Sequence, residues 1–523
     1  MPARQAAAQV RALLADAPRR RDLLIEHLHA LQDRFGHLTP EHLAALADEM
    51  QLATDEVVAI ASSWPHFEQL ATGVAGPSAL AVRVCRGLSC ELAGGLRLRQ
   101  DLARRLGPDA RVTSAPCMGR CEQAPAVLVG RHPVPCATAA RVADAVAEGA
   151  VDHEPEGYVG FSQYRAAGGY RLLAACMQGE RAVGAVVDAL DSCGPGSDGS
   201  RAARRWRSVR EAPAPRLVAV DAGGGEAGDF RDRLYLERDP HRLLEGMLVA
   251  AWAVGAQAAY LHLRADWHGC RKLLEQELAR LRADPPAAGL PHIELRRSAG
   301  RPGAGAADAM IAALQGGARG SGGSDLFGRP TLAHDVETLY WLRQLLEDGT
   351  DWFRHKGVNG RQGLRSHAVS GRVQLPGLKL APVASTAQEL VDEHCGGMAD
   401  GHALYAVVRP GAAAPLLPAD LVDTPLAEGR LPHAPALVVL SGHDRAAVAA
   451  RHLLQQRADG QELCPACRAG AAEAVLLLQG TRPPRARLAA LAEQIGADCR
   501  CGEGPALAEP LASLLRHFPH ELR

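Results

Sequence analysis

The chain has 523 residues, which is too long for one hydrophobic core and predicts several domains. Hydrophobic residues make up 47% of it and charged residues 22%, as in ordinary folded soluble proteins. The formal net charge of -1 excludes an electrostatic argument for nucleic acid or an anionic membrane as partner, and we expect neither. The N-terminal segment has neither a signal-peptide core nor the features of a transit peptide, so we expect a cytoplasmic location.

The N-terminal residues 1–75 are expected to form a helical bundle. Apolar residues recur at helical spacing along this stretch, and Thr39 followed by Pro40 is typical of a helix start. Residues 76–150 alternate extended and helical segments, which predicts a small α/β domain.

Residues 155–360 alternate strands and helices in the pattern of a doubly wound α/β fold, which binds cofactors at the carboxyl ends of its strands. The most apolar run, residues 246–264, is short and interrupted by polar residues, so it predicts a buried helix followed by a strand and no membrane span. Residues 364–433 contain short extended runs and predict a compact α+β module. Residues 440–523 predict a C-terminal helical bundle.

Cysteine spacing is the strongest signal in the chain. Thirteen cysteines are many for a cytoplasmic protein, because structural disulfides are rare in reducing compartments. Eight of them fall into close pairs along the sequence, namely Cys85, Cys90, Cys117, Cys121, Cys464, Cys467, Cys499 and Cys501. Four thiolates from two loops of one α/β domain can bind zinc or an iron-sulfur cluster, and the spacing of the first two pairs does not decide between them. Four unligated buried cysteines are the alternative.

The segment that begins LLIEHLHALQDRFGHLTPEHLAALADEM, together with the first cysteine set, resembles the thioredoxin-like [2Fe-2S] subunit of respiratory complex I and its bacterial relatives. The resemblance implies a thioredoxin-like fold for residues 76–150. It also implies that the four ligands of a [2Fe-2S] cluster are Cys85, Cys90, Cys117 and Cys121.

The resemblance continues into a second subunit of the same complex. The motifs DFRDRLYLERDPHRLLEG, HDVETL, VSGRVQLPG and CPACRAG resemble those of the NADH-binding flavoprotein subunit of the 51 kDa type. A fusion of the two parts resembles the β subunit of NAD-dependent formate dehydrogenases. It implies a Rossmann-like domain for FMN and NAD at residues 155–360, and a β-grasp-like module of the SLBB type at 364–433. The implied partners are other subunits of an oxidoreductase complex, such as a molybdenum formate dehydrogenase catalytic subunit.

The first cofactor loop departs from the family pattern. Gly194, Gly196 and Gly199 match the family's glycine loop, but its two arginines and its Phe-Pro pair are absent. A GxGxxG motif alone is a weak signal, and here it follows a helical stretch instead of a strand. Arg204 and Arg205 could still neutralise a flavin phosphate. Flavin binding and a plain glycine turn therefore both stay open.

Two further loops have changed their polar residues. Asp221 stands where the family has an asparagine, and Glu226 alone is kept of the acids that follow. This loss removes acceptors for ribose hydroxyls and for the nicotinamide amide. His334 and Asp335 replace two asparagines that approach the flavin in the family. A new carboxylate there would disfavour reduction of an FMN whose reduced form is anionic.

The C-terminal cysteines match three of the four ligands that the resemblance implies. The family motif is Cys-x2-Cys-x2-Cys with a distant fourth cysteine, and its first position is Gln461 here. Cys464, Cys467 and Cys501 match the other positions, and Cys499 is the candidate replacement. The alternatives are a [4Fe-4S] cluster that recruits Cys499, a three-iron cluster, a zinc site and an empty site.

These features lead to three hypotheses about function. The first is an iron-sulfur flavoprotein subunit with NADH-dependent, diaphorase-type oxidoreductase activity, in which electrons pass between NAD(H), FMN and the clusters. The second is a diverged relay or structural subunit that keeps the [2Fe-2S] domain but no longer oxidises NADH. The third is a zinc-stabilised interaction protein without flavin.

Overall fold

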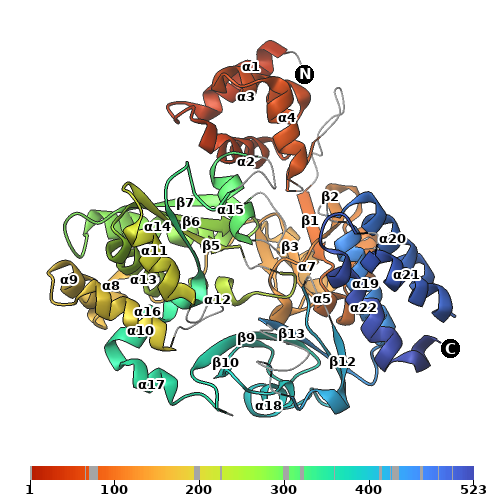
Figure 1. Ribbon diagram of the computed structural model, residues 1–523. Helices are drawn as coiled ribbons and strands as arrows, with labels where there is room; N and C mark the ends of the chain where they lie inside the picture. The colour runs from red at the N-terminus through yellow and green to blue at the C-terminus, as the bar shows by residue number, and fades with distance from the viewer. Residues whose placement is uncertain are drawn as a thin grey trace. The chain divides into compact units, whose positions relative to one another are not determined.

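The computed structural model describes residues 3–522 except 65, 70–79, 194–200, 224–225, 299–305, 318–322, 359, 412–414, 425, 427–434, 460–462, 481 and 498. The chain forms two compact units (Figure 1). Unit 1 comprises residues 1–80, 154–223 and 235–350, and unit 2 comprises residues 81–153, 224–234 and 351–523. Within the described part of the chain, every helix is too short or too polar to span a bilayer.

Unit 1 begins with four helices around a shared apolar core. The Thr39 side chain accepts a hydrogen bond from the backbone N–H of His42, and Pro40 follows at the first helical position. This confirms the helix start predicted at this threonine. The helices are α1 (Ala3–Leu14), α2 (Leu24–Phe35), α3 (Pro40–Met50) and α4 (Thr54–Ser63).

The rest of unit 1 is an α/β domain built on one parallel sheet. Its strands are β5 (Arg216–Ala222), β6 (Ala256–Arg264), β7 (His292–Ser298) and β8 (Thr331–Asp335). They lie in the order β7-β6-β5-β8, and every neighbouring pair is parallel. The chain moves outward from β5 to β7 and then returns to the other side of β5, so the direction of winding changes between β5 and β8. Doubly wound folds bind ligands at the carboxyl ends of the strands at such a point.

Helices surround this sheet (Figure 1). The helix α13 (Pro240–Val254) is almost wholly buried, ends at the left-handed Gly255 and leads directly into β6. This confirms the helix and strand predicted for residues 246–264. The other helices of the domain are α8 (Phe161–Ala166), α9 (Arg171–Met177), α10 (Val183–Cys193), α11 (Arg201–Glu211), α14 (His268–Ala283), α15 (Ala306–Leu314) and α16 (Val336–Asp348).

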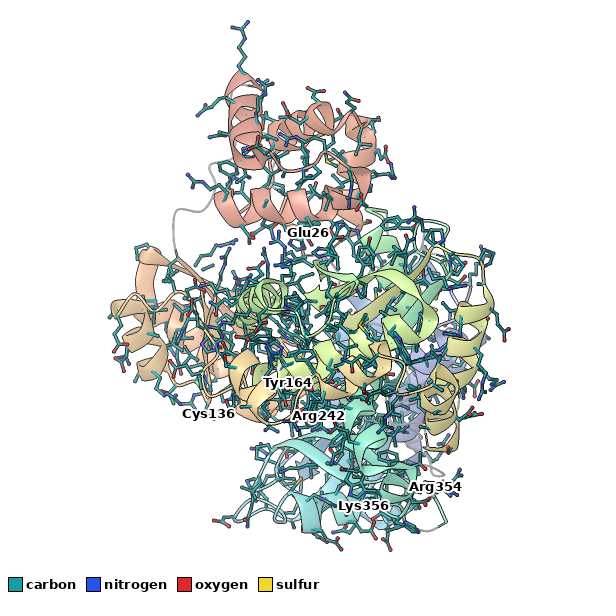
Figure 2. All side chains as sticks on the ribbon, turned by 90° about the vertical axis from the view of Figure 1, so that its left-hand side faces the viewer. Glu26, Cys136, Tyr164, Arg242, Arg354 and Lys356 are labelled. Carbon is teal, nitrogen blue, oxygen red and sulfur yellow. The ribbon has the colours of Figure 1, made fainter. Side chains whose placement is uncertain are left out.

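Charged contacts bind the N-terminal helices to the edge strand β7. The guanidinium of Arg297 lies 2.8 Å from a carboxylate oxygen of Glu26 and 2.6 Å from one of Asp33. Figure 2 shows Glu26 on the side of the bundle that faces the α/β domain. The neighbouring Arg296 bonds Asp22 over 2.8 Å. Since both arginines are buried, these bonds satisfy charges that water cannot reach.

Unit 2 begins with a small α/β domain. Its sheet has the order β2-β1-β3-β4, and β3 is antiparallel to both β1 and β4. The elements are β1 (Leu80–Cys85), α5 (Leu88–Leu92), α6 (Gly95–Leu106), β2 (Ala110–Ala115), β3 (Val127–Val129), β4 (His132–Val134) and α7 (Ala139–Ala147). Both loops that carry the first cysteine set follow strands of this sheet.

A five-stranded sheet and a group of helices complete unit 2. The sheet order is β10-β9-β13-β11-β12, with β13 parallel to β9 and the other pairs antiparallel. The strands are β9 (Leu364–Gly371), β10 (Gly377–Pro382), β11 (Leu404–Val408), β12 (Leu416–Pro418) and β13 (Ala436–Ser441). The C-terminal helices are α19 (Ala446–Ala458), α20 (Pro465–Gln479), α21 (Arg485–Ala497) and α22 (Gly504–His517). The central strand β13 begins at Ala436, after residue 433, where the predicted α+β module ends.

Candidate cofactor sites

The four cysteines of the first set meet in one buried place in unit 2. Cys85 ends β1, Cys90 lies in α5, and Cys117 and Cys121 lie in the loop after β2. Each is at most 3% exposed, and the Sγ atoms of Cys117 and Cys121 are 3.4 Å apart. A Cβ atom on Gly87 would lie 3.4 Å from the Sγ atoms of both Cys85 and Cys117, so the glycine leaves room where the two loops meet.

The surroundings of these sulfur atoms suit an anionic metal centre. The thiol neighbours Cys117 and Cys90, together with burial, raise the pKa of Cys85 well above its usual value. All four sulfurs can become thiolates only if a cation compensates them. Backbone N–H groups point at three of them, from Gly87 to Cys85 over 3.3 Å, from Ala126 to Cys90 over 3.4 Å, and from Gly228 to Cys117 over 3.3 Å.

The spread of the first cysteine set favours two metal ions over one. Among the described residues, three ligand atoms lie within 4.8 Å of one another only at Cys464, Cys467 and Cys501. One tetrahedral zinc with bonds of about 2.3 Å would need its four sulfurs about 3.8 Å apart. The first set is too open for that geometry, whereas a [2Fe-2S] cluster takes one pair of sulfurs on each iron.

The second cysteine set converges between three C-terminal helices. Cys464 precedes α20, Cys467 lies in its first turn, and Cys499 and Cys501 lie between α21 and α22. The Sγ of Cys501 is 3.8 Å from that of Cys467 and 3.6 Å from that of Cys499. The backbone N–H of Gly504 donates to Cys499 over 2.9 Å. All four predicted ligand residues therefore lie together, while Gln461 lies outside the described residues.

The thiols of this second set differ in their readiness to ionise. Hydrogen bonds from the backbone N–H groups of Arg500 and Cys467 lower the pKa of Cys464 to about 6. Burial raises the pKa of Cys467 far above its usual value, and the neighbouring thiols add to this effect. One sulfur is thus ready to bind a metal at neutral pH, and the buried one requires the metal to displace its proton.

The carboxyl edge of the parallel sheet in unit 1 carries two acidic residues. Asp221 on β5 pairs in register with His262 on β6 and with Asp335 on β8. Its Oδ1 lies 3.1 Å from Nδ1 of His262, whose Nε2 is buried without a hydrogen-bond partner among the described residues. Sequence reasoning missed His262 as a site residue, although its place at the end of a parallel strand was the available signal.

Asp335 is also the N-cap of α16. Its carboxylate accepts hydrogen bonds from the backbone N–H of Thr338 over 2.8 Å and from the Thr338 hydroxyl over 3.0 Å. Burial alone would raise the pKa of Asp335, but these bonds and the nearby His334 outweigh it and hold the pKa far below its usual value. The carboxylate is therefore charged at neutral pH, as the sequence argument about flavin reduction requires.

We expect Asp335→Asn to separate the role of Asp335 as a helix cap from its role as a negative charge near the flavin. Asparagine caps helices as well as aspartate does, so the unfolding temperature should stay nearly unchanged, whereas Asp335→Ala should cost about 1 kcal/mol. Removing the charge should raise the reduction potential of bound flavin. Thermal unfolding and a redox titration of the flavin measure the two effects, and a fall in potential for Asp335→Asn would contradict the electrostatic role.

The remaining predicted flavin residues are only partly described. Gly194, Gly196 and Gly199 lie outside the described residues. Arg205 lies on α11, next to the wholly buried Trp206, whose ring contacts His334 on β8 at 6.1 Å between centroids. In unit 2, the Glu226 carboxylate lies so close to Gly411 that a Cβ atom there would clash with it.

Comparisons with known proteins agree with these sites. Three family models match the chain: "Thioredoxin-like [2Fe-2S] ferredoxin" at residues 10–150, "Nuo51 FMN-binding domain" at 188–343, and "NADH-ubiquinone oxidoreductase-F iron-sulfur binding region" at 451–523. The chain thus carries [2Fe-2S], FMN-binding and iron-sulfur domains, and the resemblance to the two complex I subunits is confirmed.

Similar proteins span most of the chain. The mitochondrial NADH-ubiquinone oxidoreductase 51 kDa subunit of Neurospora crassa is 30% identical over 343 residues, which are 59% of this chain and 68% of that protein. An NADH-quinone oxidoreductase subunit of Rhizobium meliloti is 28% identical over 70% of this chain and 94% of its own length. The alpha subunit of the NAD-reducing hydrogenase HoxS of Cupriavidus necator is 26% identical over 68% of this chain and 67% of its own.

A solved structure of an NAD+-reducing [NiFe]-hydrogenase in the H2-reduced state has a chain that superposes with a TM-score of 0.81 and 25% identity. The match covers 97% of this chain and 93% of that one. The fused arrangement of domains therefore has a counterpart of nearly equal length. The chain belongs to the family of electron-transfer flavoprotein subunits of NADH-quinone oxidoreductases and NAD-reducing hydrogenases, with a thioredoxin-like [2Fe-2S] domain in the same polypeptide.

Proposed function

We propose that this chain oxidises or forms NADH on a bound FMN and passes single electrons through its iron-sulfur centres to a partner subunit. The observation that carries this proposal is the convergence of both cysteine sets, Cys85 to Cys121 and Cys464 to Cys501, on separate sites. FMN bound near the carboxyl ends of β5 and β8 would convert a two-electron hydride transfer into single-electron steps.

The residues that would hold the flavin divide by role. The glycine loop, Gly194 to Gly199, would approach the phosphate, and Arg205 would neutralise its charge. Asp221 would accept hydrogen bonds from donors of the cofactors. Asp335 would place a negative charge near the flavin, which stabilises its oxidised form.

The proposal extends to the partner and the place of action. We propose a cytoplasmic complex in which another subunit holds a second active site. A molybdenum formate dehydrogenase subunit stays a prediction, because the relatives named above are subunits of quinone oxidoreductases and of a hydrogenase. The domain limits 1–75, 76–150, 155–360, 364–433 and 440–523, and the β-grasp-like character of the fourth, also stay predictions.

A second function is favoured by one observation. The edge of the parallel sheet carries two carboxylates, Asp221 and Asp335, and a charged edge of this kind disfavours an anionic reduced flavin. A chain that has lost flavin would remain as an electron relay or structural subunit with its [2Fe-2S] domain. Zinc in both cysteine sets, with no flavin, would support an interaction protein instead.

One purification distinguishes these functions. The full chain is purified without oxygen, and its flavin, iron, sulfide and zinc are measured together with the reduction of an artificial dye by NADH. We expect FMN, iron in both cysteine sets and dye reduction. Iron of about two atoms per chain without flavin would leave the relay function, and zinc alone would refute both electron-transfer functions.

A further inference from the structure

A short segment of unit 2 lies directly against the first cysteine set. Residues 226–234 follow the second cofactor loop in sequence and enter α12 (Arg231–Arg238). The backbone N–H of Gly228 donates to the Sγ of Cys117 over 3.3 Å. The wholly buried Phe230 packs with Cys117 and Cys121. The segment thus gives one sulfur a hydrogen-bond donor and covers two sulfurs with an apolar ring.

Arg233 fixes this segment to the cysteine loop. Its side chain is wholly buried, its Nε donates to the backbone carbonyl of Gly119 over 2.8 Å, and its guanidinium pairs with the Glu122 carboxylate. Both partners lie in the loop that carries Cys117 and Cys121. Because a buried guanidinium is costly unless it is paired, these two bonds determine where the segment and the loop can lie.

We propose that Arg233 is a positioning residue that holds the Cys117 loop against the Gly228 N–H, and that this arrangement raises the reduction potential of the iron-sulfur centre bound there. The role rests on the proposed [2Fe-2S] cluster at these cysteines. In the reduction one electron enters the centre, its charge becomes more negative by one, and no bond forms or breaks. Hydrogen bonds to ligand sulfurs stabilise the reduced state more than the oxidised state, and the bond from Gly228 to Cys117 forms only while the loop is held in place.

The test is a redox titration of the full chain, purified without oxygen and followed by the electron paramagnetic resonance signal of the reduced centre. We expect Arg233→Gln to lower the midpoint potential and change the shape of the signal. Arg233→Lys keeps the charge but not the paired bonds, so its potential should fall less. The control is Arg487→Gln. Arg487 on α21 forms an exposed ion pair with Glu473 on α20, so its removal should change neither the midpoint potential nor the shape of the signal.

Glu122→Gln distinguishes position from charge. If charge alone set the potential, removing this carboxylate would raise the potential by about as much as Arg233→Gln lowers it. If Glu122 instead acts by holding the cysteine loop to Arg233, its replacement should lower the midpoint potential. A rise in Glu122→Gln, or an unchanged midpoint in Arg233→Gln, overturns the positioning role. If Arg233→Gln does not assemble, Arg233→Lys and Glu122→Gln decide the question. A wild-type chain without a [2Fe-2S] signal would refute the proposed function as well.

Discussion

Cys501→Ser should remove the metal from the C-terminal cysteine set. The Sγ of Cys501 lies within 4.8 Å of the Sγ atoms of both Cys464 and Cys467, so it is central to any centre bound there. A serine hydroxyl does not offer the thiolate that iron-sulfur clusters require. For a [4Fe-4S] cluster we expect the iron content to fall by about four atoms per chain, measured by metal analysis of anaerobically purified protein.

Cys499→Ser decides which residue has replaced the cysteine lost at Gln461. The Cys499 sulfur lies 3.6 Å from that of Cys501, and the backbone N–H of Gly504 donates to it. This placement leads us to expect the same loss of iron as in Cys501→Ser. Full iron content in Cys499→Ser would show instead that the centre has another fourth ligand or only three.

A lone cysteine of the same unit provides the control. Cys395 is wholly buried in an apolar cluster with Val369 of β9 and Val439 of β13, and burial raises the pKa of its thiol to about 11. Its neighbours in this cluster are apolar side chains, and it belongs to neither cysteine set, so we expect it to bind no metal. Cys395→Ser should therefore retain all the iron. Unchanged metal content in Cys501→Ser would refute the assignment of this cysteine as a ligand, whatever the control shows.

Local patterns in the sequence predicted the parts of the fold that depend on near neighbours. Thr39 with Pro40 predicted the start of α3, and the apolar run at residues 246–264 predicted a buried helix and its following strand. These features depend on contacts within a few residues, which spacing and residue type encode. Cysteine spacing likewise grouped residues whose sulfur atoms lie near one another in the structure, at both candidate metal sites.

Such local patterns could not predict contacts between residues that are far apart in the sequence. His262 meets Asp221 only because β5 and β6 pair in one register, and a shift of one residue would turn the two side chains to opposite faces. The bonds from Arg233 to Gly119 and Glu122 join segments more than a hundred residues apart. Asp335 shows a third limit. The resemblance predicted that it contacts the flavin, and its role as the N-cap of α16 was not predicted.

Glu245→Ala should cause the largest loss of stability outside the metal sites. Glu245 is wholly buried on α13, and its carboxylate accepts hydrogen bonds from the Tyr164 hydroxyl over 2.6 Å and the Tyr170 backbone N–H over 2.9 Å. A third bond, from the backbone N–H of Leu173, is 3.3 Å long. Alanine would leave these buried donors unsatisfied, which we expect to cost about 3 kcal/mol.

These bonds fix the two short helices α8 and α9, which are followed in the chain by α10 and then by the glycine loop. Figure 2 labels Tyr164 on α8, and Tyr170 stands immediately before α9. The Tyr170 hydroxyl continues the network to Nδ1 of His241 over 2.7 Å, and Nε2 of His241 reaches Glu277 over 2.7 Å. Loss of Glu245 should therefore loosen α8 and α9, on which the position of α10 and of the expected flavin loop depends. We expect less bound flavin as well as lower stability in the variant.

Thermal unfolding and flavin content measured on the same preparations test this expectation. A loss of about 3 kcal/mol corresponds to a fall of about 6–12 °C in the transition of unit 1. Glu245→Gln keeps the shape and one acceptor oxygen, so it should fall about half as far. Glu473→Ala, which removes a carboxylate from an exposed pair with Arg487, should leave both measurements unchanged. Equal melting temperatures for wild type and Glu245→Ala would mean that water replaces the carboxylate, because only another acceptor could satisfy the donors of Tyr164, Tyr170 and Leu173.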